Sequence, residues 1–279
     1  MKNNYNTAPT KEESINYFKG LPPCPQVVSE SGARSARLME GRPQGVPGAS
    51  GMMDVQSDDS GNDLASVGTD ESVVIAFADG VSPENRSAVL LSMKFAEAAA
   101  RAQDNGNLDR LQWLENYEKA MFHGGWLGLG GKHLTEFSSS DVSLTMDSLV
   151  IDLIGAIAGP NKAAVLQLLS LTLDKLQGDD ALMKLFEQNS KKGTISSFRI
   201  MPCLESPTGI PVTYLLALEV DHASYTGGAL FWKWSVSRLS IRELVSGLNF
   251  DLASHNDNKH LMRDYIKGNA EDFFAGLPR

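Results

Sequence analysis

The architecture of the chain follows from residues 194–220, which read TISSFRIMPCLESPTGIPVTYLLALEV. Two runs rich in β-branched and aliphatic residues, Thr194–Cys203 and Pro211–Val220, are separated by the turn residues Ser206-Pro207-Thr208-Gly209. A third run, Ala229–Leu239, alternates apolar and polar side chains. Together the three runs predict an antiparallel meander.

One further strand and several helices are predicted before the meander in the sequence, and one helix is predicted after it. The apolar run Val73–Ala78 predicts a buried strand. Ser82-Pro83-Glu84 then supplies an N-cap, a proline and an acid for the start of a helix that reaches about Gln103. Further helices are predicted over Leu108–His123 and Asp257–Phe274. The predicted fold class is therefore α+β (mixed α/β), with a helical layer packed on a mainly antiparallel sheet.

The most apolar part of the chain is a predicted helical hairpin over Leu149–Leu176, with its turn at Gly159-Pro160. Insertion into a membrane is one interpretation, but Asp152, Lys162 and Asp174 interrupt the hairpin and each half is too short to span. Buried core helices are the ordinary interpretation. The hairpin is also a candidate wall for a lipid cavity. The expected cavity-lining residues are Leu149, Ile154, Ile157, Leu166, Leu169 and Leu173.

The first quarter of the chain has a different composition from the rest. Residues 41–68 are rich in Gly, Ser, Asp and Pro, and only a short helix is predicted upstream, over Lys11–Lys19, after a capping box that begins at Thr10. We therefore expect residues 1–70 to form an extended or partly flexible N-terminal arm, and residues 71–279 to form a single α/β globular domain. The role of the arm and of Cys24 is left open at this stage.

Charge and composition exclude several classes of partner. With 25 Lys and Arg against 34 Asp and Glu, the formal net charge of the 279 residues is −9, which argues against nucleic acid. The start of the chain lacks the apolar region of a signal peptide, and no run is long enough for a transmembrane segment. We expect a cytoplasmic protein, or one exported by a route independent of a signal peptide.

Two short motifs resemble catalytic signatures but have simpler explanations. His123-Gly124-Gly125-Trp126 is similar to an esterase oxyanion loop, yet it follows a predicted helix and no nucleophile elbow accompanies it, so helix termination is preferred. Phe77-Ala78-Asp79-Gly80 is similar to the metal-binding strand of metal-dependent Ser/Thr phosphatases, but no partner motifs are found and a turn is preferred. The five histidines show no spacing typical of a metal site, and none is predicted.

Cys203 is the main candidate for a functional residue, and three roles are open to it. A buried apolar role is the commonest one for a free cysteine. A nucleophilic role, in a Cys-dependent acyltransferase or hydrolase, needs a base to form the thiolate, and His222 is predicted to lie roughly 35 Å along the sheet. The third role is a thioester to a fatty acid, whose tail the apolar hairpin would enclose.

The chain resembles the Erwinia virulence factor family in its length, its mixed α/β layout and the lone cysteine of Ile200-Met201-Pro202-Cys203-Leu204 in its C-terminal third. The resemblance implies a protein of bacterial persistence in insect guts, with palmitate thioester-linked to a cysteine, here Cys203. The leading hypothesis is a virulence or toxin-like protein that binds a fatty acyl chain. An enzyme with Cys203 as nucleophile is the second hypothesis. The third is an interaction module whose N-terminal arm binds a host or secretion-system protein.

Overall fold

The structure is a computed structural model of the chain, and it describes residues 5–24, 52–54, 65–68, 73–104, 110–128, 133–139, 142–178, 191–192, 195–222, 233–236 and 239–275. The chain forms two compact units. Unit 1 comprises residues 1–50, 87–127 and 250–279, and unit 2 comprises residues 51–86 and 128–249. Each unit is therefore assembled from segments that are distant in sequence.

Unit 2 is built on a mixed sheet with the strand order β1-β2-β3-β8-β9-β11. All neighbouring pairs in this order are antiparallel except β3 and β8, which are parallel. The strands are β1 (Met52–Asp54), β2 (Ala65–Gly68), β3 (Val73–Phe77), β8 (Ile195–Glu205), β9 (Pro211–His222) and β11 (Leu239–Phe250). In addition, β5 (His133–Ser139) pairs with β11, and β7 (Lys191–Lys192) pairs with β8.

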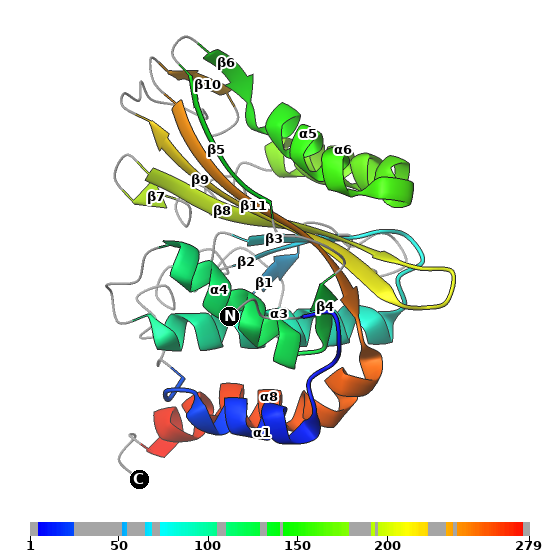
Figure 1. Cartoon of the computed structure of the whole chain (residues 1–279), viewed down its shortest axis with the longest axis vertical. Helices are drawn as coiled ribbons and strands as arrows, with labels where there is room; N and C mark the ends of the chain where they lie inside the picture. Colours follow the sequence, from blue (N-terminus) through cyan, green and yellow to red (C-terminus); the bar gives the residue numbers. More distant parts are fainter. Residues whose placement is uncertain are drawn as a thin grey trace, which may run out of the picture. The chain divides into compact units, whose positions relative to one another are not determined.

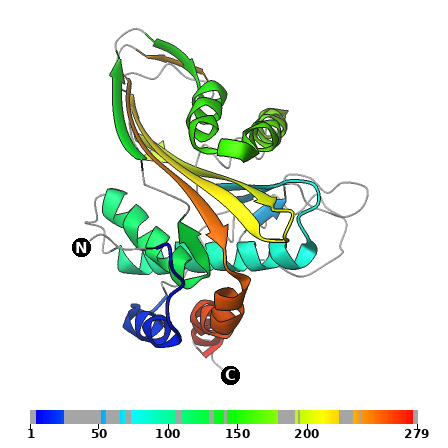
Figure 2. The ribbon, with the colours of Figure 1, turned by 45° about the vertical axis from the view of Figure 1, so that its right-hand side comes forward.

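A helical hairpin covers one face of this sheet, as Figure 2 shows. It consists of α5 (Met146–Ile157), a 3₁₀ turn over Gly159–Asn161, and α6 (Lys162–Gly178). The helix α6 contacts β3 and β8, and α5 contacts β9. The buried residues of α6 recur at helical spacing, namely Val165, Leu168, Leu169, Thr172 and Leu173. The hairpin thus presents one apolar stripe to the sheet and a more polar face away from it.

Unit 1 is mainly helical. It contains α1 (Lys11–Gly20), most of α3 (Pro83–Gln103), α4 (Arg110–His123) and α8 (Leu252–Ala275). The helices α1 and α8 lie side by side (Figure 1), and α8 also contacts α4. The short strand β4 (Trp126–Gly128) follows α4.

The predicted α+β class is confirmed, and most predicted elements are present. Thr10 and Glu13 form the expected capping box of α1. The Oγ of Ser82 accepts a hydrogen bond from the Asn85 amide at the start of α3, as expected of an N-cap.

The third strand of the meander was predicted in the wrong place. Lys233–Val236 is a strand, β10, but it pairs with β6 (Val142–Thr145) in a separate two-stranded sheet. The strand that follows β9 in the main sheet is β11, and Leu239 to Asn249 of β11 pair with His222 back to Val212. The difference lies in long-range pairing: the 12-residue β11 pairs with the 12-residue β9 over nearly its whole length, whereas the four-residue β10 pairs with β6.

The units divide the chain differently from the boundary expected near residue 70. The helix α1 belongs to unit 1, and the strands β1 and β2 belong to unit 2. The physical reason in unit 1 is that α1 carries a buried face, because Ser14 is buried and the ring of Phe18 stacks on Phe95. Residues 25–51 lie outside the described part of the chain.

Candidate functional site

The candidate site begins with Cys203, near the end of β8. Cys203 pairs with Phe77 of β3 on one side and with Thr213 of β9 on the other. Its carbonyl accepts a hydrogen bond from the Ala78 amide at 2.9 Å. The side chain is fully buried, and its Sγ lies 3.9 Å from the Leu204 carbonyl oxygen. The thiol therefore lies on an inner strand of the sheet, near the end of that strand.

Strand alternation assigns Cys203 to one face of the sheet. Paired residues on adjacent strands point to the same face, so Phe77 and Met201 share the face of Cys203. Leu215, two residues from Thr213 along β9, also shares it. All of these side chains are buried. The thiol thus lies beside apolar side chains, on a face that also carries the buried polar residues Thr213 and Arg199.

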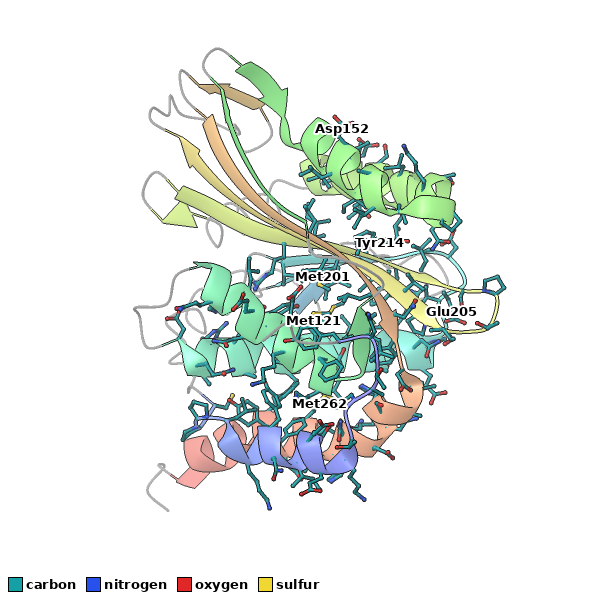
Figure 3. The ribbon with its side chains drawn as sticks, in the orientation of Figure 1. Met121, Asp152, Met201, Glu205, Tyr214 and Met262 are labelled. Carbon is teal, nitrogen blue, oxygen red and sulfur yellow. The ribbon has the colours of Figure 1, made fainter. Side chains whose placement is uncertain are left out.

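The hairpin packs on the opposite face. Tyr214, one residue from Thr213, donates a hydrogen bond from its hydroxyl to the Ala158 carbonyl between α5 and α6 (3.1 Å), and Figure 3 shows Tyr214 between the sheet and this hairpin. Ala76 packs with Leu168 of α6 and is one residue from Phe77. The structure therefore does not bring the hairpin and the Cys203 thiol together, because the sheet separates them.

The hairpin residues expected to line a cavity have different surroundings. Ile154, Leu169 and Leu173 are fully buried, as core side chains are. Ile157 and Leu166 are half-buried, and the side chain of Leu149 lies outside the described residues. Ile154, Leu169 and Leu173 thus belong to the buried stripe of the hairpin, which is the pattern of core packing, whereas Ile157 and Leu166 lie at its margin.

The chemistry open to Cys203 is set by its burial. Burial raises the pKa of the thiol to about 12, with a smaller contribution from the Glu205 carboxylate, and the Arg86 guanidinium opposes the rise. Thr213 is nine residues from His222 along β9, so this histidine lies roughly 30 Å from the thiol. At neutral pH the side chain is a neutral thiol without hydroxyl or imidazole assistance in the contacts described for it.

A second polar cluster lies in unit 1, where sequence reasoning did not look for one. His123 Nδ1 lies 3.3 Å from Ser14 Oγ, and the Asn258 side-chain amide donates to Ser14 Oγ at 3.1 Å and to the His123 carbonyl at 2.9 Å. This arrangement is similar to a Ser-His pair, but all three residues are buried, with Ser14 only 1% exposed. A nucleophile there is closed to substrate, so the cluster is structural in this conformation.

The two catalytic-like motifs have the simpler explanations preferred from the sequence. The helix α4 ends at His123, and Gly125 takes the positive φ of +109° that ends helices. Asp79 is exposed in a turn in which the Val81 amide donates to the Ala78 carbonyl. Among the residues that the structure describes, no group of three metal-ligating side chains comes together.

Sequence reasoning also missed the residue that holds the hairpin turn. The Tyr214 hydroxyl donates to Ala158 and accepts a hydrogen bond from the Asn161 side chain at 3.1 Å. A tyrosine inside an apolar strand, opposite the Gly-Pro-Asn turn of a hairpin, was the available signal, because a buried phenol needs a partner.

Comparisons with known proteins give structural likenesses only. No protein-family model matches the chain, and no curated protein matches it in sequence. A delta-endotoxin structure is 14% identical with a TM-score of 0.39, over 65% of this chain and 84% of its own. The activated Cyt2Ba monomer of Bacillus thuringiensis subsp. israelensis is 13% identical with a TM-score of 0.37, over 66% of this chain and 99% of its own.

The structure of the Evf virulence factor is 9% identical with a TM-score of 0.33, over 72% of this chain and 79% of its own. Likenesses at this level do not establish family membership or a function. Separately, within the described residues no helix has the length and apolar character needed to cross a bilayer.

Proposed function

We propose that this protein is a toxin-like, lipid-binding protein that carries a fatty acyl chain as a thioester on Cys203. The virulence part of the proposal rests on the resemblance to the Erwinia virulence factor family drawn from the sequence. The lipid part rests on one observation, the position of a fully buried thiol beside the apolar side chains of Phe77, Met201 and Leu215. Palmitate is the acyl group that the resemblance implies.

Burial favours a permanently attached acyl chain over a catalytic intermediate. A nucleophilic cysteine needs an accessible thiolate, whereas burial raises the pKa of Cys203 to about 12 and holds it as the neutral thiol. The same burial would protect a thioester from water. The acyltransferase or hydrolase alternative is therefore the weaker candidate.

The proposed position of the acyl chain differs from the one expected from the sequence. The chain would lie along the face that carries Phe77, Met201 and Leu215, and not against the α5–α6 hairpin. Burying a palmitoyl chain contributes about 0.8 kcal/mol per methylene, roughly ten kcal/mol in all, which would offset the cost of separating these side chains.

Attachment requires an acyl donor. In the proposed exchange the Cys203 sulfur attacks the carbonyl carbon of an acyl thioester, a new C–S bond forms, and the donor thiol leaves with the proton that Cys203 gives up. Because Cys203 is enclosed in the folded chain, this exchange would take place before the sheet closes over the thiol.

Intact-mass measurement on protein purified from its own host tests the proposal. We expect the mass of the chain plus one acyl group, located on the peptide that contains Cys203 and removed by hydroxylamine. Cys24→Ser is the matched control and should keep the adduct, whereas Cys203→Ala should lose it while retaining its circular dichroism spectrum. An unmodified Cys203 in the native protein rejects the proposal.

The same preparations separate the enzyme alternative from the proposed function. A fixed lipid predicts an adduct that survives days in neutral buffer, and no turnover of acyl thioester donors. An adduct that disappears on standing, together with release of free fatty acid that Cys203→Ala abolishes, would instead identify Cys203 as a nucleophile.

A further inference from the structure

Three helices of unit 1 meet at the carboxyl end of α4, and two buried histidines form the junction. His123, the last residue of α4, has Ser14 of α1 beside Nδ1, and its ring stacks on Tyr17 of α1 with centroids 4.1 Å apart. Asn258 of α8 joins α8 to both other helices, because its side-chain amide donates to the His123 carbonyl of α4 and to the Ser14 hydroxyl of α1. The side chain of His123 thus contacts α1, while its backbone carbonyl is hydrogen-bonded to α8.

His255 of α8 makes a similar contact with Gly124, the residue that follows His123. Its Nδ1 lies 3.0 Å from the Gly124 carbonyl oxygen, and since a carbonyl only accepts, Nδ1 carries the proton and donates. The side chain is fully buried, and its Nε2 has no hydrogen-bond partner in the structure. In the neutral ring Nε2 is an unprotonated lone pair, and protonation would create a buried donor without an acceptor.

The charged groups around the two rings do not favour protonation on balance. Near His123 they are Lys119 on α4, which disfavours a positive charge, and Glu13 on α1, which favours it. Near His255 they are Lys259 and Arg263 on α8, both of which disfavour it. Burial is the larger cause in each case and lowers both histidine pKa values, that of His123 to about 4.

We propose that the junction of α1, α4 and α8 is an acid-sensitive switch, in which proton uptake by His123 and His255 releases α1 and α8 from the end of α4. The junction is closed while both rings are neutral and their Nδ1 atoms keep the contacts to Ser14 and Gly124. Solvent-exposed histidines accept protons readily, so opening the junction provides the route by which the two rings become charged. The device needs no ligand, only a fall in pH.

The direction of the effect follows from proton linkage. A histidine whose pKa is lowered in the closed state binds more protons when open, so the closed state is favoured above about pH 6.5 and loses that preference as the pH falls toward 4. From pH 7 to pH 5, His123 alone would raise the opening constant about twenty-fold, and His255 would add to this.

Hydrogen exchange of the full chain at pH 7.5, 6 and 5 tests the switch. After correction for the intrinsic pH dependence of exchange, the amides of α1 and of the first turns of α8 should lose protection at low pH, whereas the β8 and β9 amides should keep theirs. The double variant His123→Gln with His255→Gln should show the same protection at all three values. His260→Gln changes an exposed histidine of the same helix and should respond to acid as the original chain does.

Three results would overturn the proposal: acid-independent protection of α1 in the original chain, an acid response that persists in the double variant, or its loss in His260→Gln. If the double variant does not fold, urea unfolding of the unaltered protein replaces it. The unfolding midpoint should then fall steadily between pH 6.5 and 4.5, and a constant midpoint over this range would contradict the switch.

Discussion

Cys203 and Cys24 offer a direct comparison at the scale of single residues. Cys203 is fully buried and Cys24 is half-buried. Because burial raises the pKa of Cys203 to about 12, we expect iodoacetamide at pH 8 to alkylate Cys24 in the folded protein and to leave Cys203 unmodified. Peptide mass spectrometry before and after unfolding measures this, with hydroxylamine added in parallel to release any thioester. Equal alkylation of both thiols in the folded protein would refute the burial of Cys203.

Among the glycines that the structure describes, Gly125 is the one at which a methyl group should be most damaging. Its φ is +109°, and a Cβ would lie 2.9 Å from the Asp251 carbonyl oxygen and 3.0 Å from the His255 Cβ. We expect Gly125→Ala to lower the free energy of unfolding by about 2–4 kcal/mol, from backbone strain and overpacking together. Gly80→Ala is the control, since its φ of +90° is similar but a Cβ there meets nothing within 4 Å. Its cost should be about 1 kcal/mol, and equal costs in urea unfolding would contradict this explanation.

At the scale of secondary-structure elements, Tyr214 fastens the α5–α6 hairpin to the sheet. Its hydroxyl donates to Ala158 and accepts from Asn161. We expect Tyr214→Phe to destabilise the protein by about 1–3 kcal/mol, because a buried carbonyl and a side-chain amide lose their partner. Urea unfolding measures the loss, and exchange of the α5 and α6 amides locates it. Tyr265→Phe, which removes a hydrogen bond to Pro22 in an exposed setting, should cost less.

Elements with local signals were predictable, and those defined by pairing were not. The capping box at Thr10 and the Ser82-Pro83-Glu84 start gave α1 and α3 within a residue or two. The start of α8 was placed too late because Asp251 was not recognised as its cap, although Asp251 accepts from the Ala253 and Ser254 amides. The third meander strand depended on which run pairs with β9, and no local property of residues 229–250 settles that choice.

At the scale of the whole molecule, the candidate site also depended on long-range contacts that the sequence alone does not predict. Cys203 and the apolar hairpin were each recognisable from the sequence as single features. Whether they meet depends on which face of β8 the thiol occupies and which face the hairpin covers, and a shift of one residue reverses the answer. The register with β3 and the Tyr214 contact supply this information, and both are long-range. The same limit applies to the N-terminal arm expected from composition. The helix α1 contacts α8, which lies far along the chain, and composition carries no information about such a contact.

Removal of residues 1–24 tests how far α1 belongs to unit 1. Phe18 stacks on Phe95, Tyr17 on His123, and Tyr265 donates to the Pro22 carbonyl. We expect the truncated chain to lose about 3 kcal/mol of unfolding free energy and to gain binding of a hydrophobic dye, as buried aromatic rings become exposed. Chemical unfolding and dye fluorescence measure the two effects. An unchanged unfolding curve would mean that this segment is the dispensable arm expected from composition.

The parallel pairing of β3 with β8 has a consequence for folding during synthesis on the ribosome. Val73 of β3 pairs with Arg199, which the ribosome adds only after α3, α4, α5 and α6 have all been made. At about 5–20 residues per second, β3 would wait roughly ten seconds for its neighbour, with a fully apolar run and no strand on that side. Over this interval the nascent chain carries an unpaired apolar strand edge, and we expect a chaperone that binds short apolar strands to bind Val73–Phe77.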